Sequence, residues 1–211
     1  MSKIIEPIRE QIPFDCFRDT ELMNLLKGSP NRRYGLIKRA LAHKELIHIR
    51  RGLYCLAERY RRQPLNLFWL AQQIYGPSYI SFESALSQHG WIPEAVHTIT
   101  SASLKRSRHW DIPLGLFSYT RIPCDPFLTR VVRETEGKIV YLIAKPWKAL
   151  ADMVYAYKKD WRGVRPLMQS LRIDEEFLTQ TDPRELEEIQ ETFRSRRVLK
   201  FFKGVRKDLK L

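Results

Sequence analysis

The sequence has few cysteines and no long apolar run. Its three cysteines, Cys16, Cys55 and Cys124, are far apart, odd in number and form no CxxC pair. Neither a disulfide framework nor a zinc site is therefore predicted, and reduced, buried cysteines are expected. No apolar stretch approaches the roughly 18 residues that a membrane-spanning helix needs, and the first residues lack a secretory core. We expect a cytoplasmic protein with no membrane partner.

Motifs that would identify an enzyme are also missing. The sequence contains no phosphate-cradling Gly-rich loop, no His-Glu-x-x-His and no nucleophile elbow. Its five histidines are scattered without metal-ligand spacing: His43, His48, His89, His97 and His109. We expect no catalytic residue, no metal and no cofactor. The remaining alternative is a nuclease site that distant Asp and Glu residues assemble in three dimensions.

Acidic residues are scarce where basic residues gather. The formal net charge is +13, which favours a polyanionic partner such as nucleic acid. Residues 27–62 hold eleven Lys and Arg against two Glu, a net charge of +9. Residues 194–211 hold eight Lys and Arg against one Asp, a net charge of +7. The rest of the chain is slightly acidic, so two basic segments flank a nearly neutral body.

The first of these basic segments follows two predicted helices. A first helix is expected over Ser2–Gln11, although Pro7 interrupts its pattern. A second is expected over Thr20–Lys27 after Asp19, a good N-cap, and Gly28 ends it. A helix, a tight Gly turn and another helix form the helix-turn-helix arrangement.

The third predicted helix carries a basic face. Ser29 caps it, Pro30 takes its first position, and no acidic residue follows before Glu45. At 100° per residue, the inward positions are Tyr34, Ile37, Ala40 and Leu41. The outward positions are Asn31, Arg32, Gly35, Lys38, Arg39, Ala42 and His43. This outward face predicts DNA-groove recognition, with base edges contacted by Asn31, Arg32 and Lys38 and phosphates by Arg33 and Arg39. A plain solvated face is the alternative.

A short hairpin is predicted next. Leu46–Arg50 alternates in polarity, Leu53–Leu56 is apolar, and Arg51-Gly52 forms the turn. Arg50 and Arg51 would lie at the tip, where the wing of a winged helix-turn-helix reaches the DNA backbone or minor groove. A surface hairpin with incidental arginines is the alternative. Residues 1–60 are thus predicted to be a winged helix-turn-helix DNA-binding domain.

The remaining chain predicts an α+β domain over residues 65–180 and a helical basic tail over residues 181–211. A polar linker, Arg59–Pro64, is expected before it. The expected helices are Leu65–Tyr75, Phe82–His89 and Trp147–Lys158, and the expected strands are Val96–Leu104, Gly115–Ile122 and Lys138–Ala144. The tail changes from acidic to basic, which suits either one helix aligned with its dipole or additional DNA affinity.

Two further groups are candidates for a partner surface or a second DNA surface. One is the basic loop that contains Lys105, Arg106 and Arg108, for which a solvated loop is an equally good interpretation. The other is the pair Lys148 and Asp152, whose i,i+4 spacing is more typical of a structural ion pair.

Several short motifs, in order, resemble a known family. Arg51-Gly52-Leu53-Tyr54 resembles the start of AbiEi-type antitoxins, the transcriptional regulators of abortive-infection (type IV) toxin–antitoxin systems. Residues 79–86, with His89-Gly90 and residues 98–101, resemble the next family block. Ala144, Pro146, Lys148, Ala149, Leu150 and Asp152 match a later block, where Trp147 replaces the glutamate of the family. The likeness covers Asp19 to Tyr157.

This resemblance implies two activities. The winged helix would bind double-stranded DNA at the promoter of its own operon and repress it. The second domain would counteract a nucleotidyltransferase-like toxin encoded alongside. Two alternatives stay open: a protein-binding antitoxin whose winged helix is vestigial, and a general RNA-binding module, which the few aromatics among the basic residues disfavour.

Overall fold

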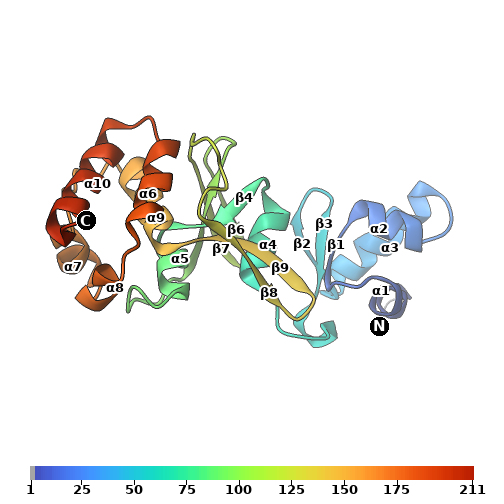
Figure 1. The fold of residues 1–211 in the computed structure, drawn as a ribbon. Helices are drawn as coiled ribbons and strands as arrows, with labels where there is room; N and C mark the ends of the chain where they lie inside the picture. Colours follow the sequence, from blue (N-terminus) through green and yellow to red (C-terminus); the bar gives the residue numbers. More distant parts are fainter. Residues whose placement is uncertain (1–2) are drawn as a thin grey trace. The chain divides into compact units, whose positions relative to one another are not determined.

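A computed structural model of the chain describes residues 3–211, and it is of the α+β class (Figure 1). The chain divides into two compact units. Unit 1 comprises the chain up to Leu70 together with Ile112–Leu114, and unit 2 comprises Ala71–Asp111 and Gly115–Leu211. Residues 181–211, expected to be a separate tail, belong to unit 2.

Within its described residues, unit 1 contains three complete helices, a three-stranded sheet and one 3₁₀ turn. The strands are antiparallel and lie in the order β1-β3-β2. The two predicted strands of the hairpin are confirmed residue for residue, whereas the sequence did not reveal β1, which is only three residues long. In chain order the elements are α1 (Ile5–Gln11), β1 (Cys16–Arg18), α2 (Asp19–Leu25), α3 (Pro30–Ala42), β2 (Leu46–Arg50), β3 (Leu53–Leu56) and η1 (Glu58–Tyr60).

The core of unit 1 is formed by the apolar faces of its helices and strands. Pro7 does not interrupt α1, because it lies in the first turn, where a proline removes no intrahelical hydrogen bond. The buried core residues are Ile4, Ile5, Ile8, Ile12, Phe17, Leu22, Leu26, Ala40, Leu46 and Leu56. α3 therefore packs on the core through the face that its periodicity indicated, with one exception.

The exception is Tyr34, which we expected to be inward. Its side chain is 68% exposed, and Leu36, Ile37 and Leu41 pack against the core instead. Periodicity cannot separate a tyrosine at the border of an apolar face from one inside it, because the side chain has an apolar ring and a polar hydroxyl.

The cap of α2 also differs from the prediction. Asp19 is the first residue of the helix, and Glu21 Oε2 accepts the backbone N–H of Arg18 at 2.8 Å.

Cys16 and Cys55 face each other in the sheet of unit 1. They are directly opposed in the β1–β3 register, and both are free and buried. The hydrogen bond to Cys55, followed by burial, raises the pKa of the Cys16 thiol. The three cysteines are thus buried as expected, but two of them are neighbours that the sequence separates by 39 positions.

The segment predicted to be a linker is partly built into unit 1. Arg62 Nε lies 2.8 Å from Asp15 Oδ1, and the Arg62 backbone N–H donates to Asp15 Oδ2 at 2.9 Å. The same guanidinium donates to the carbonyls of Arg9 and Ile12 at 3.1 and 2.9 Å. These bonds hold the chain after η1 on the connection between α1 and β1.

Unit 2 is built on a six-stranded sheet in the order β6-β7-β5-β4-β9-β8. β4 pairs antiparallel with β5 and parallel with β9, β5 pairs parallel with β7, and β8 pairs antiparallel with β9. The strands are β4 (Ser78–Ile80), β5 (Thr98–Ser103), β6 (Arg108–Ile112), β7 (Gly115–Arg121), β8 (Val131–Glu136) and β9 (Ile139–Ala144). The three predicted strands correspond to β5, β7 and β9.

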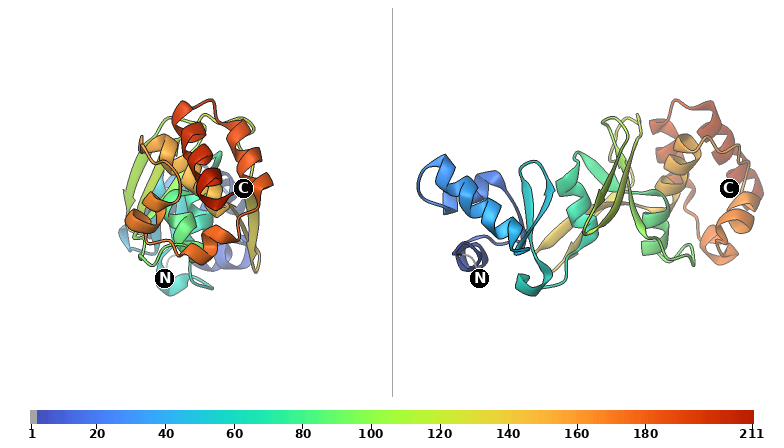
Figure 2. Two further views of the ribbon diagram at one scale, coloured as in Figure 1. Left: turned by 60° about the vertical axis from the view of Figure 1, so that its left-hand side comes forward. Right: turned by 180° about the vertical axis from the view of Figure 1, so that it is seen from behind.

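The three predicted helices of this region are confirmed, and each of their ends lies within two residues of the predicted position. The helices from α4 onward are α4 (Leu67–Ile74), α5 (Phe82–Gln88), α6 (Pro146–Ala156), α7 (Arg165–Leu171), α8 (Glu175–Thr179), α9 (Pro183–Thr192) and α10 (Arg196–Leu209). The division between the two units falls inside α4. Figure 2 shows α6, α9 and α10 packed side by side in unit 2.

A buried polar network joins α6 to the sheet. Lys148 and Asp152 form an ion pair with both side chains 0% exposed. Lys148 Nζ also donates to the Tyr79 hydroxyl at 2.7 Å, and that hydroxyl donates to Asp152 Oδ2 at 2.9 Å. Ser81, at the N-cap of α5, donates its hydroxyl to the same carboxylate at 2.7 Å instead of capping its helix. Burial, and then the Asp152 charge, raise the pKa of Tyr79 well above its ordinary value.

The acidic and basic parts of the predicted tail are two separate helices. α9 begins as expected at Pro183, where the Asp182 carboxylate accepts the Arg184 N–H at 2.9 Å. It ends before Phe193, and α10 starts at Arg196. The expectation of one helix with acidic residues early and basic residues late is therefore wrong.

Removing one partner of the Lys148–Asp152 pair should strongly destabilise unit 2. Lys148→Met would leave the Asp152 carboxylate buried without its cation and should lower the free energy of unfolding by about 3–5 kcal/mol. Adding Asp152→Asn should recover part of this loss, because the amide is neutral and still accepts from Tyr79 or Ser81. Urea unfolding measures both variants. The exposed Lys159→Met is the control and should change stability by less than about 0.5 kcal/mol; an equal effect of both lysine variants would contradict the assignment.

Candidate nucleic-acid interface

The start of α3 is shaped by a left-handed glycine and a side-chain cap. Gly28 has φ +110°, and Ser29 Oγ accepts the Arg32 N–H at 3.3 Å. Arg33 folds back, and its guanidinium donates to the Gly28 carbonyl at 3.1 Å. Arg33, predicted to contact phosphate, is therefore half-buried and braces the turn between α2 and α3.

The outward face of α3 is open to solvent. Asn31, Arg32, Lys38 and Arg39 are all exposed. Gly35 lies in the same face, and a Cβ placed on it would meet no atom within 4 Å. The outward face of α3 thus combines exposed amide, guanidinium and ammonium groups with Gly35, where no side chain covers the helix backbone.

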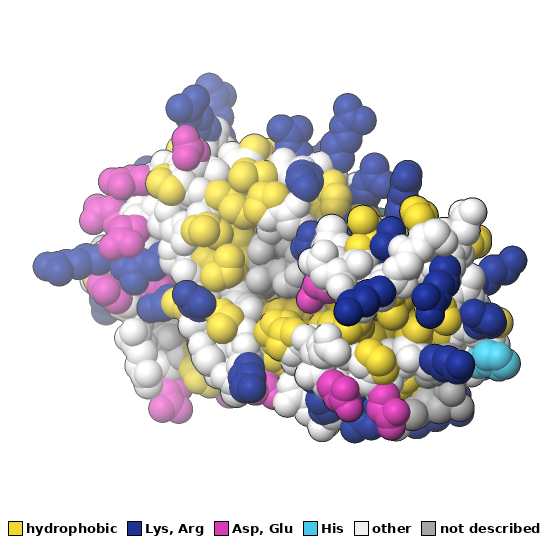
Figure 3. Space-filling model, turned by 90° about the vertical axis from the view of Figure 1, so that its right-hand side faces the viewer, with side chains coloured by type: hydrophobic (Ala, Val, Ile, Leu, Met, Phe, Trp, Pro, Cys, Tyr) yellow, Lys and Arg dark blue, Asp and Glu magenta, His cyan; other side chains and the backbone are white. Residues whose placement is uncertain are grey.

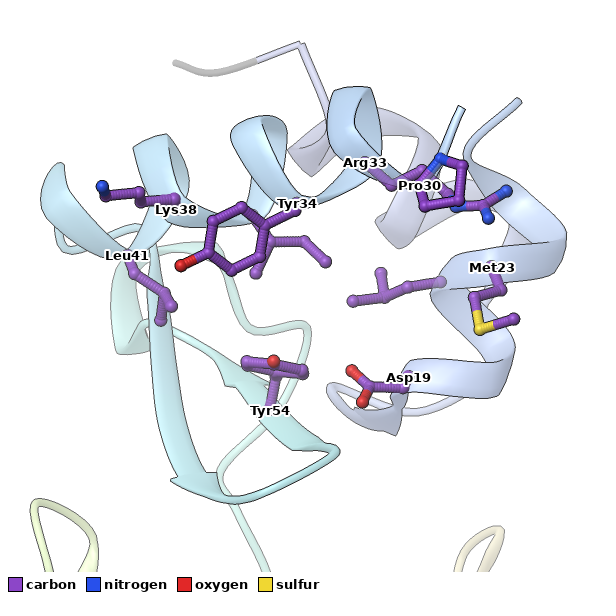
Figure 4. A pocket seen from close by; sticks show the side chains of 10 residues that line it. Asp19, Met23, Pro30, Arg33, Tyr34, Lys38, Leu41 and Tyr54 are labelled. Carbon is purple, nitrogen blue, oxygen red and sulfur yellow. The ribbon is translucent and has the colours of Figure 1, made fainter. Parts of the chain in front are cut away.

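One flank of α3 borders an apolar pocket of about 440 Å³ (Figure 4). Tyr34 and Leu41 descend from α3 toward Tyr54 on β3, while Met23 of α2 closes the other end. Lys38 stands at the rim of the pocket and points out of it. Burial, and then the Asp19 charge, raise the pKa of Tyr54. The pocket is lined by Asp19, Leu22, Met23, Pro30, Arg33, Tyr34, Ile37, Lys38, Leu41 and Tyr54.

The opposite flank of α3 borders a more polar groove of about 620 Å³. Arg59 of η1 reaches this flank and donates to the His43 carbonyl at 3.2 Å. The predicted DNA contacts are therefore divided, with Arg32 and Arg39 on this side and Lys38 on the other. The groove is lined by Lys3, Arg32, Leu36, Arg39, His43, Glu45, Arg59 and Tyr60.

The hairpin tip is tied to the start of α2. The Gly52 carbonyl accepts the Asp19 N–H at 3.1 Å, and Gly52 itself has φ +74°. Arg51 is exposed at the tip, whereas Arg50 is half-buried and donates to the Arg51 carbonyl at 3.3 Å. Arg51 is thus the freer of the two predicted wing residues.

In the space-filling view of Figure 3, Lys and Arg side chains lie on both sides of an apolar strip on the part of the molecule nearest the viewer.

No protein-family model matches the chain, and no curated protein matches it in sequence. The AbiEi-type resemblance therefore rests on the short motifs alone. Arg51-Gly52-Leu53-Tyr54 corresponds to the hairpin tip and β3, residues 79–86 to the end of β4 and α5, and residues 144–152 to the start of α6. Trp147, which replaces the family glutamate, is buried and donates its Nε1–H to Thr181 Oγ1 at 3.1 Å.

Of the two residue groups predicted to form a second surface, only the basic loop is exposed. Lys148 and Asp152 are in the interior, so they cannot contact a partner, and their spacing reflects the structural ion pair. Arg106 and Arg108 are exposed. Lys105 is exposed as well, but its ammonium donates to the Gly76 carbonyl and lies 5.3 Å from the centre of the Tyr75 ring.

Two other features are absent from residues 3–211. No group of three or more His, Cys, Asp or Glu side chains in this range is arranged to hold a metal ion. Among the same residues, no helix is both long and apolar enough to cross a bilayer.

Sequence reasoning missed the residues that reach α3 from other elements. Tyr54 and Met23 line the apolar flank, and Arg59 and Tyr60 line the polar one. Arg59 had a usable signal, since it extends the basic run of residues 27–62. Tyr54 belongs to the Arg51–Tyr54 motif, but no signal in the sequence placed Tyr54 or Met23 next to α3, because that position follows from tertiary packing.

Two glycine substitutions test the geometry of α3. Gly35→Ala should raise the free energy of unfolding by about 0.5–1 kcal/mol, because alanine is the better helix former and the site is open. Gly28→Ala should lower it by roughly 1–2 kcal/mol, since φ is positive and the new Cβ would lie 3.0 Å from Arg32 Cδ. Urea unfolding measures both; effects of the same sign would contradict the placement of these residues.

Proposed function

We propose that this protein is a sequence-specific DNA-binding autorepressor of the AbiEi antitoxin type, with unit 1 acting as a winged helix-turn-helix. The observation that carries the DNA-binding part is the exposed, acid-free face of α3 next to the β2–β3 hairpin. The element order α1-β1-α2-α3-β2-β3, with the sheet order β1-β3-β2, supports a helix-turn-helix followed by a wing.

The division of the basic side chains suggests distinct roles. Asn31, Arg32 and Lys38 are exposed on α3 and have the donors that read base edges in a major groove. Gly35 would let the helix backbone approach the groove closely. Arg39 and Arg51 would contact phosphates, and Arg33 and Arg50 would act mainly by holding the turn and the tip.

The antitoxin role rests on the motif resemblance. In this proposal unit 2 counteracts a nucleotidyltransferase-like toxin, and its exposed surface, not Lys148 or Asp152, provides any contact. Arg106 and Arg108 on the loop before and at the start of β6 are the exposed cations that we expected there.

One observation favours a second candidate, a protein-binding antitoxin whose winged helix does not act on DNA. Tyr34 and Met23 are 68% and 54% exposed beside the apolar pocket, and exposed apolar groups of this kind are common in protein interfaces. Toxin neutralisation that survives the loss of all DNA binding, with unchanged operon expression, would favour this candidate.

Gel-shift titration against the DNA upstream of its own gene, with scrambled duplex as competitor, tests the proposal. We expect a preference of at least ~10³-fold at physiological salt. Arg32→Ala or Lys38→Ala should weaken operator binding by about 1–3 kcal/mol and leave scrambled binding nearly unchanged. Arg51→Ala should weaken both duplexes alike and lower the salt slope by about 1.

Arg9→Ala is the matched control, because Arg9 is an exposed cation on α1 outside the proposed interface. It should change operator binding less than about 2-fold. Unchanged operator binding by a variant that lacks Arg32, Lys38 and Arg51 would refute the assignment of α3 and the hairpin.

A further inference from the structure

A row of cations runs along α10 in unit 2. Arg196, Lys200, Lys203 and Lys207 are all exposed and recur at intervals of four, three and four residues. At 100° per residue they fall within an arc of about 60°, and at 1.5 Å per residue they extend over about 16 Å. We call these four residues the α10 stripe.

The α10 stripe has no acidic partner in the part of the chain that the structure describes. None of its four residues forms an ion pair with a carboxylate within 4.0 Å. The single acidic residue of α10, Asp208, lies outside the arc and accepts the Val164 N–H at 3.0 Å. The stripe is therefore a block of positive charge without internal compensation.

Among the four stripe residues, the helix dipole favours only Lys207, which lies in the last turn of α10. The first turn of α10 has no acidic residue and carries Arg196 and Arg197, although cations are unfavourable at the positive end of a helix dipole. Lys200 and Lys203 lie in the middle of the helix, where the dipole has little effect. The helix is held instead by its opposite face, on which Val198, Phe201, Phe202 and Val205 are 0% exposed.

We propose that the α10 stripe binds the phosphodiester backbone of duplex nucleic acid, as a surface of unit 2 that is additional to the α3 interface of unit 1. A B-form duplex carries one negative charge per about 1.7 Å of its axis when both strands are counted, so a row of cations about 16 Å long faces several phosphates. The four lysine and arginine heads of the stripe match this density of negative charge in sign and extent. Such contacts add affinity and carry no sequence preference.

Other anionic partners fit the same surface less well. A helix that lies on a membrane needs an exposed apolar face, and on α10 the apolar face is packed inside, with Leu199 alone reaching 37% exposure. Single-stranded nucleic acid is usually held by aromatic stacking, but both phenylalanines of α10 are buried. An acidic protein surface would ordinarily be anchored by aromatic side chains that the stripe lacks.

The test uses the full chain in the background of Arg32→Ala, Lys38→Ala and Arg51→Ala, so that duplex binding by unit 1 is reduced. The stripe variant carries Lys200→Gln, Lys203→Gln and Lys207→Gln. The charge-matched control carries Lys138→Gln, Lys158→Gln and Lys159→Gln, three lysines of unit 2 that are also exposed. Fluorescence anisotropy is measured over a range of salt with a scrambled DNA duplex and an RNA duplex of equal length.

The stripe variant should bind the DNA duplex, the RNA duplex or both at least ~10-fold more weakly than its parent, and the salt slope should fall by about 2–3. The control should stay within about 2-fold of the parent, and whichever duplex responds identifies the source of the backbone. Equal losses in the two variants, or no loss in either, would overturn the proposal. Binding to anionic vesicles that only the stripe variant loses, with duplex binding unchanged, would also overturn it and assign the surface to a membrane.

The test of the α10 stripe is separate from the test of operator recognition by α3. The α3 proposal is judged by the ratio of operator to scrambled affinity, whereas the stripe is judged by scrambled affinity alone. Either can fail while the other stands.

Discussion

The ion pair of Lys148 and Asp152 is the constraint on which unit 2 depends. Two charges that are both 0% exposed require several polar partners. Here those partners come from β4 through Tyr79 and from the N-cap of α5 through Ser81. The Lys148 ammonium also lies 4.7 Å from the centre of the Phe193 ring, at the junction between α9 and α10. The network thus joins α6 to the sheet and to the end of α9.

Unit 1 uses its positive charges in two different ways. Arg33, Arg59 and Arg62 donate to backbone carbonyls and stabilise turns and connections. Arg32, Lys38 and Arg51 are exposed at the face that we propose for DNA. The net charge of residues 27–62 therefore overstates the charge that is free to bind a polyanion. Substitutions in the first group should act through stability, and those in the second through affinity.

Features specified within a few residues could be predicted from the sequence, and features that depend on distant pairing could not. Ser29, Pro30 and the Arg51-Gly52 turn mark their elements locally, and all three were placed correctly. β4 was missed because it has only three residues. β6 and β8 were missed because they are the edge strands of the sheet and largely exposed, so no apolar alternation marks them in the sequence. The opposition of Cys16 and Cys55 depends on the pairing of distant strands. For the candidate interface, the residues of α3 and the tip were predictable, while Tyr54 and Arg59 reach α3 only through tertiary packing.

A close crossing between α10 and the chain before α7 has a further consequence. A Cβ on Gly204 would lie 2.4 Å from the Gly163 backbone nitrogen, and one on Gly163 would strike the Asp208 carboxylate. The close packing of α10, and with it the direction in which its lysines point, thus depends on Gly204, a residue with no side chain and no charge. Because these lysines are exposed, replacing any one of them should change the stability of the fold little. A side chain at Gly204 would meet the backbone of residues 162 and 163, so its replacement would displace α10 and all of these lysines together.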